Sequence, residues 1–264
     1  AELGKMLSSS DGRTLQAAED SMTRLAHSVG REAGGAKRLE VEKQLIALLG
    51  AGQPPGARVV ALRLLSLIGG EAAVAAAAKL LGDANLREEA AFCLERIPLP
   101  SAVQAFMGAY AGAPDDFKPR ILAALGHRKA EEAAELAGEA MGSSNTEIAM
   151  AGMRALARIG KRPAKEPRPP DYASLSEWQK TEFADSLLRF AAEQARRGSA
   201  EEALRLYKVA LQQDASHVRC AAVVGLSKMA TPEAAALILP LLKSSDNTLR
   251  RTAEQAWDAF KQKG

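Results

Sequence analysis

Basic side chains recur at two positions of a pattern that repeats along the chain. Each copy has an anchor residue, and the positions two before and two after it hold Arg or Lys in five of twelve places, more than 35 such residues in 264 would give by chance. These positions lie about 160° and 200° around a helix from the anchor, opposite its apolar face. Guanidinium and ammonium groups bind carboxylates, sulfates and phosphates. The spacing predicts a partner-binding stripe of Arg63, Phe92, Arg96, His127, Arg154, Arg158 and Lys228, widened one turn earlier by Arg120.

Acidic residues leave an alternative open for this stripe. Glu88, Glu89 and Glu95 lie among its members in the sequence. If they neutralise the basic groups, the arginines serve only as solvating charges.

Enzyme and metal-site patterns are absent from the sequence. His27, His127 and His217 lack a Cys or carboxylate at metal-ligand spacing. The chain has no Gly-rich phosphate loop, serine nucleophile elbow or paired-histidine zinc motif. Asp115 and Asp116 precede a helix, where carboxylates cap free amides and offset the dipole. We therefore expect no catalytic residue, metal or cofactor.

Composition points to an all-helical protein. About a fifth of the residues are alanine, aromatic residues make up 4%, and β-branched runs are scarce. A net charge of +3 is far below the density that would by itself indicate nucleic-acid binding. No apolar stretch approaches the length of about 18 residues that spans a bilayer, so we expect no membrane insertion. Cys93 and Cys220 have no disulfide or finger spacing and are expected to be buried thiols.

The repeat has a period close to thirty residues. Each copy predicts one amphipathic helix, preceded by a helix over 39–49, 71–81, 101–111, 130–141 or 232–243. A hairpin of this size cannot bury its own apolar face and must stack on its neighbours. The successive anchors are Leu65, Leu94, Leu125, Leu156, Leu226 and Trp257.

The step of 70 residues between the last two leucine anchors contains a proline-rich stretch. Four of its prolines fall in 161–176, which predicts an extended, solvated connector between residues 1–160 and 177–264. After it we expect helices over 177–197 and 199–213, with capping boxes at Ser176 with Gln179 and Ser199 with Glu202. Thr231 before Pro232 reads as another N-cap.

Three segments resemble the second helix of HEAT repeats: Asp83–Arg87, Asp214–Arg219 and Asp246–Arg250. The resemblance implies one continuous right-handed α-solenoid of HEAT-like hairpins whose second helices line the concave surface. It also implies a structural ladder, in which arginines bond to aspartates of neighbouring turns. Its members are Arg58, Arg87, Arg219 and Arg250.

Residues 187–215 are similar to a tetratricopeptide hairpin. The small and aromatic packing positions of that family correspond to Ala191, Gly198, Ala203, Tyr207 and Ala210. The order of segments in the whole chain looks like helical arrays of bacterial envelope or secreted proteins, which often accompany sugar-active domains. This resemblance favours a periplasmic or secreted location over a cytoplasmic one.

These patterns favour a non-catalytic scaffold that binds another protein or peptide, of acidic character, on a concave and partly basic surface. The alternatives are a nucleic-acid binding protein related to HEAT-like DNA glycosylases and an accessory domain of a larger sugar-active enzyme. Nothing in the pattern specifies an oligomeric state. Glu254 replaces an apolar residue of the inner repeats, so the last helix is expected to face water as a cap.

Overall fold

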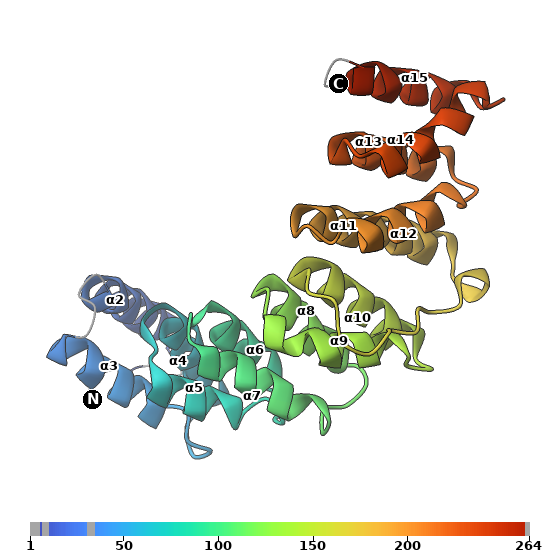
Figure 1. The fold of residues 1–264 in the computed structure, drawn as a ribbon. Helices are drawn as coiled ribbons and strands as arrows, with labels where there is room; N and C mark the ends of the chain where they lie inside the picture. Colours follow the sequence, from blue (N-terminus) through green and yellow to red (C-terminus); the bar gives the residue numbers. More distant parts are fainter. Residues whose placement is uncertain (1–5, 7–10, 31–34, 262–264) are drawn as a thin grey trace. The chain divides into compact units, whose positions relative to one another are not determined.

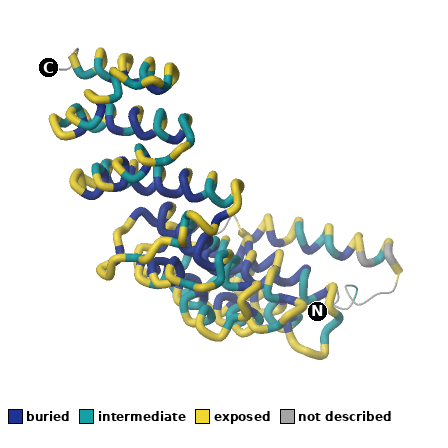
Figure 2. The backbone as a smooth tube through the Cα atoms, turned by 90° about the vertical axis from the view of Figure 1, so that its right-hand side faces the viewer, coloured by how far each residue is buried: buried dark blue, intermediate teal, exposed yellow. Residues whose placement is uncertain are grey.

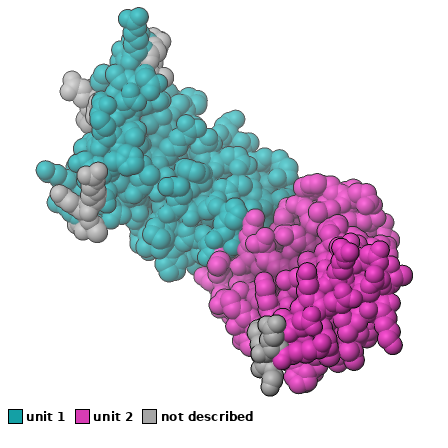
Figure 3. Space-filling model, turned by 90° about the horizontal axis from the view of Figure 1, so that it is seen from above, with its two compact units in different colours: residues 1–128 teal, residues 129–264 magenta. Residues whose placement is uncertain are grey.

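The computed structural model describes Met6 and residues 11–30 and 35–261, and within these residues it contains helices and no strand. The chain divides into two compact units, the first ending at Arg128 and the second beginning at Lys129 (Figure 3). The expected all-α solenoid of stacked helical hairpins is confirmed; its right-handed sense stays a prediction.

The first unit contains two layers of helices (Figure 1). In one layer α3 packs on α5 and α5 on α7, and in the other α2 packs on α4, α4 on α6 and α6 on α8. We call these the A layer and the B layer. The bounds are α2 Gly12–Gly30, α3 Ala36–Ala47, α4 Pro55–Ile68, α5 Glu71–Ala78, α6 Arg87–Arg96, α7 Pro100–Tyr110 and α8 Lys118–His127.

The second unit, taken by itself, also has two layers of helices, arranged in successive tiers (Figure 1). Its B layer contains α10, α11, α13 and α15, and its A layer contains α9, α12 and α14. The bounds are η1 Glu131–Ala133, α9 Ala134–Met141, α10 Thr146–Ile159, η2 Tyr172–Ser174, α11 Glu177–Arg196, α12 Ala200–Leu211, α13 Ser216–Met229, α14 Pro232–Ile238, η3 Leu239–Lys243 and α15 Asn247–Lys261.

Burial follows the repeat pattern. Five anchors, the leucines, are at most 2% exposed, and the apolar residues eight positions earlier are buried too. Buried positions lie along the faces where helices pack, and exposed ones on the outer faces and turns (Figure 2). Trp257, the last anchor, is less buried than the leucine anchors, and the smaller Ala253 and Ala256 are the buried residues beside it on α15. Glu254 is exposed, as the cap requires.

Helix starts follow the predicted caps at two of three sites. The Ser176 hydroxyl accepts from the Gln179 amide in a complete capping box, and Thr231 caps α14 ahead of Pro232. The predicted capping box at Ser199 is absent from the described structure. Its ψ of 64° is not the extended value that an N-cap needs, and Glu202 binds Arg205 instead of the backbone.

Helix ends are closed by side chains from neighbouring helices. Arg128 donates to four carbonyls around the end of α6, those of Leu94, Glu95, Ile97 and Leu99. In the second unit, Gln194 donates to the Gly160 carbonyl at 2.7 Å. Because the last carbonyls of a helix lack partners within it, these contacts fasten one helix to the next.

The α10 and α11 helices are parallel, although they follow one another in the chain. Gln179, near the start of α11, bonds Glu147 near the start of α10, and Gln194 near its end bonds Gly160 after α10. The chain must therefore return along the unit between them. Residues 161–171, which we call the strap, make this return without a helix.

The strap is docked on the second unit, so the expectation of a solvated connector was wrong. Pro163 is buried against Gly138 of α9, and the Ala164 amide donates to Glu135 of α9. On its other side Arg162 and Glu166 pair with α12. These contacts tie 129–160 to 177–264, so the unit boundary falls at Arg128 and not in 161–176.

A first prediction concerns the close approach of α9 and α10. A Cβ at Gly152 would lie 2.8 Å from both the Ala137 carbonyl oxygen and the Met141 nitrogen. We expect Gly152→Ala to lower the free energy of unfolding by about 1–3 kcal/mol, because backbone atoms must shift. The control, Gly108→Ala in α7, meets open space and should raise it by about 0.5–1 kcal/mol. Urea denaturation followed by circular dichroism measures both, and equal effects would contradict the packing argument.

A second prediction concerns pH. Hydrogen bonds from Arg196 hold the pKa of Glu193 at about 2, against the opposing effect of burial, and Arg197 adds to the shift. A carboxyl with a depressed folded pKa contributes stability above its ordinary pKa of about 4.5, and this is lost as pH falls towards 2. Glu193→Gln should therefore weaken the fall in melting temperature across this window, whereas Asp185→Asn, at an exposed pair, should not. Melting temperatures that fall equally with pH in both variants would contradict this prediction.

Candidate functional site

The outward face of α4 and α6 contains a hollow in the first unit. It is lined by Arg63, Ser66, Leu67, Glu88, Glu89, Phe92 and Arg96. Leu67 and Phe92 are large apolar side chains that remain 38% and 43% exposed. The Arg96 guanidinium lies over the Phe92 ring, 5.5 Å from its centroid. The structure thus gathers three members of the predicted stripe, Arg63, Phe92 and Arg96, around one apolar patch.

The two arginines of this hollow differ in their electrostatic surroundings. Arg63 is 63% exposed and lies 3.6 Å from Glu89, a weak pair at the surface. Arg96 is exposed and has no carboxylate within ion-pair distance among the residues that the structure describes. Its contact is the face of Phe92, an arrangement in which a guanidinium keeps its outer edge available to a carboxylate.

Arg120 and His127 of the predicted stripe are held by acidic residues of α6. Arg120 lies 2.7 Å from Glu95 and 3.5 Å from Glu88, and His127 Nδ1 lies 2.7 Å from Glu95. Partial burial alone would raise the pKa of Glu95, but the hydrogen bonds from His127 and Arg120 outweigh it and keep this pKa below its ordinary value. At these two positions the acidic side chains offset the basic ones, as the alternative interpretation expects.

The other members of the stripe belong to the second unit. Arg154 bonds Glu182 at 2.6 Å. Arg158 lines a shallow groove between α10 and α11 that also contains Asp185 and Arg189. Lys228 is exposed on α13. Within each unit the basic side chains therefore alternate with carboxylates, and they do not form an uninterrupted positive surface.

The arginines of the predicted ladder reach towards the following hairpin. Arg58 lies 3.4 Å from Asp83, Arg87 lies 2.7 Å from Asp116, and Arg219 lies 3.0 Å from Asp246. Arg87 also lies over the Phe117 ring, 5.0 Å from its centroid. Arg250 differs, since it bonds the Ser244 carbonyl and Asn247 of its own hairpin.

The cysteines are both free thiols. Cys93 is buried, and desolvation raises its pKa to about 12. Cys220 is only partly buried, so the expectation of two buried thiols was wrong for this residue: it lies about 200° around α13 from Val218 and Ala222, which belong to the buried face.

Two features are missing from the residues that the structure describes. Residues 11–30 and 35–261 contain no group of three or more His, Cys, Asp or Glu side chains arranged to hold a metal ion. In the same part of the chain, no helix combines the length and the apolar character needed to cross a bilayer.

Sequence reasoning missed the side chains that close helix ends, above all Arg128 and Gln194. It also missed Glu42, which is 4% exposed and accepts from the Gly70 and Ala73 amides at the start of α5. These residues lie 28 to 34 positions from their partners. Because each residue contacts a helix end about one repeat away in the sequence, this spacing is the signal that could have identified them.

Comparisons with known proteins give similarities in fold. No family model matches the chain, and no curated protein matches it. Human deoxyhypusine hydroxylase in complex with glycerol aligns with a TM-score of 0.43 and 20% identity over 85% of this chain and 98% of that one. An engineered protein aligns with a TM-score of 0.39 and 18% identity, covering 98% and 88% of the two chains. A designed armadillo repeat protein in complex with peptide (KR)4 aligns with a TM-score of 0.28 and 16% identity over 98% of each chain.

A third prediction distinguishes the residues of the structural ladder from those of the partner-binding stripe by their effect on stability. Arg87→Ala removes an ion pair and a ring contact and should lower the free energy of unfolding by about 1 kcal/mol, which corresponds to about 2–4 °C in melting temperature for a chain of this size. Arg96→Ala removes a side chain on the surface and should change it by less than about 0.5 kcal/mol. Thermal melts of the two variants decide the matter, and an equal loss in both would place Arg96 in the structural set.

Proposed function

We propose that this chain is a non-catalytic helical-repeat scaffold that binds a peptide segment of another protein at the hollow on α4 and α6. The observation that carries the proposal is the exposed pair Leu67 and Phe92, set between Arg63 and Arg96. Exposed large apolar side chains grouped in a hollow and rimmed by charge are typical of interaction sites.

The chemistry of the hollow indicates the kind of peptide. Leu67 and Phe92 offer an apolar surface for one large side chain of the partner, and an aromatic ring next to an arginine is a frequent binding hot spot. Arg96 can donate hydrogen bonds to a carboxylate while it stays stacked on Phe92. Glu88 and Glu89 on the other side disfavour a uniformly acidic peptide. The expected ligand is therefore a short segment with a large apolar residue followed closely by a single Asp or Glu.

Nucleic-acid binding is the alternative function, and the pairing of charges supports it less. Binding to a phosphate backbone depends on basic groups that can replace condensed counterions. Arg120, His127 and Arg154 instead lie within 2.7 Å of carboxylates, which a phosphate would have to displace.

The fourth prediction tests the proposal with peptides of defined composition. Random peptides displayed on phage and selected on the full chain should enrich a large apolar residue near one acidic residue. Synthetic peptides from this set should bind the double variant Arg63→Glu, Arg96→Glu at least tenfold more weakly in fluorescence polarisation, because repulsion replaces attraction. Phe92→Ser should weaken binding to a similar extent by removing the apolar contact.

A matched control reverses two charges in the other layer. Lys43 on α3 and Lys79 after α5 are exposed, so Lys43→Glu, Lys79→Glu makes the same change in net charge away from the hollow. This variant should bind as the parent does. Failure to enrich any peptide, or equal weakening by both double variants, would contradict the proposal. Duplex DNA binding that falls steeply with salt and is lost in the first double variant would favour the alternative.

A further inference from the structure

The strap occupies a place where the A layer has no helix. It contacts α9 through Gly138 and Glu135 on one side and α12 through Glu202 and Arg205 on the other. A helix with its side chains is about 10–12 Å across, whereas an extended chain is about half as wide. An extended strap therefore cannot fill the volume that a helix would fill between α9 and α12.

The unfilled volume is a cavity of about 120 Å³ beneath the strap. Its walls come from α9, α10, α11, α12 and the strap itself, and they are mainly apolar, with Met153, Phe183, Leu187, Phe190, Leu206 and Pro163 among them. All of these side chains are buried. An engineered apolar cavity of about 150 Å³ is known to stay dry and to bind benzene.

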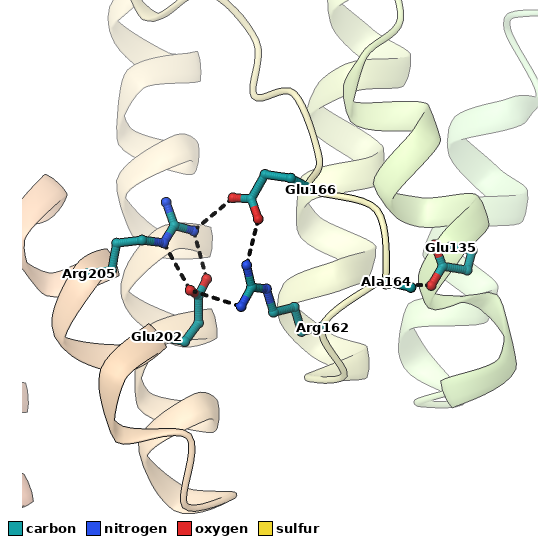
Figure 4. A network of polar contacts seen from close by, with 6 residues as sticks. All are labelled: Glu135, Arg162, Ala164, Glu166, Glu202 and Arg205. Atoms are coloured by element: carbon teal, nitrogen blue, oxygen red, sulfur yellow. Dashed lines mark hydrogen bonds and ion pairs between the residues drawn. The ribbon is translucent and has the colours of Figure 1, made fainter.

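Four charged side chains line the cavity and pair in a ring, whose members Figure 4 shows. Arg162 lies 2.7 Å from Glu166 and 3.6 Å from Glu202, and Arg205 lies 3.2 Å from Glu166 and 2.7 Å from Glu202. Each guanidinium thus contacts both carboxylates, and the ring has no net charge. A charged ligand would gain little from it and would lose its hydration on entering the apolar space.

One polar group inside the wall points to the nature of the ligand. Ser186 of α11 lines the cavity and is 3% exposed. Within the described part of the chain its hydroxyl makes no hydrogen bond, in contrast to Ser66, whose hydroxyl donates to the Arg63 carbonyl. The Ser186 hydroxyl oxygen keeps some accessible surface, so a polar group of a ligand can hydrogen-bond it.

We propose that this cavity binds a small uncharged aromatic molecule with one hydroxyl group, a phenol in size and polarity. The ring lies against the phenylalanine, leucine and methionine side chains, and the hydroxyl bonds Ser186. The strap and its charged ring cover the ligand. This site is separate from the peptide hollow, which belongs to the other unit.

The test uses phenol and benzene as probes on the full chain, with isothermal titration calorimetry and ligand-observed NMR. We expect saturable binding of one molecule per chain, with phenol bound several-fold more tightly than benzene. Ser186→Ala should abolish this preference while benzene still binds. Ala157 also lines the cavity, so Ala157→Leu should fill it and abolish binding of both probes.

A control variant tests whether an effect on binding is specific to the cavity, and a second cavity variant replaces Ala157→Leu if that protein does not fold. Ala72→Leu adds the same atoms at an exposed position of α5 and should leave binding unchanged. If Ala157→Leu does not fold, Met153→Ala enlarges the cavity and should admit 1-naphthol, which the parent should reject. No saturable binding in the parent, or unchanged phenol binding in folded Ala157→Leu, would overturn the proposal, whatever the result of the peptide selection.

Discussion

A helical hairpin of about thirty residues can neither bury its own apolar face nor provide hydrogen-bond partners for the backbone groups at the ends of its helices. Most helices here are short and rich in alanine, so each buries little surface unless a neighbour covers it. The last carbonyls of each helix also lack partners within it. Both needs are met by neighbouring helices: anchor leucines pack between hairpins, while Arg128 and Gln194 close the ends of α6 and α10. Stability and order of the stack therefore come from contacts between neighbouring hairpins as well as from those between the two helices of each hairpin.

The same constraint explains the most irregular part of the second unit. Because α10 and α11 are parallel neighbours, the chain between them must run back along the stack, as an A-layer helix does elsewhere. Prolines make that return extended instead of helical. The strap then needs other attachments, which the Arg162, Glu166, Glu202 and Arg205 ring and the Ala164 amide provide. A cavity remains because the extended strap is narrower than the helix that would fit in the same place.

The sequence predicted what depends on periodicity and missed what depends on contacts between repeats. Helix positions and buried anchors follow from apolar spacing, and they were predicted within a few residues. Trp257 is less buried than the other anchors, because a bulky residue at an inner position can be turned outward when alanines beside it pack more closely. The predicted capping box at Ser199 was wrong, because a capping motif in the sequence does not fix the backbone conformation that capping needs. For the candidate site, spacing identified the outward positions of Arg63, Phe92 and Arg96. It could not show that Glu95 would take up both Arg120 and His127, since that depends on how adjacent helices align.

The strap also has a consequence for how such a chain can change during evolution. Inserting residues into a helix rotates everything after them by about 100° per residue and so disrupts the packed face. An extended segment has no such periodic constraint, and within its described residues only the Ala164 main-chain amide is bonded to a side chain of another element. Insertions after Pro169, beyond the contacts that Glu166 makes with α12, would leave the registration of α10 and α11 intact. This is the place at which the second unit can acquire new sequence at least cost to its architecture.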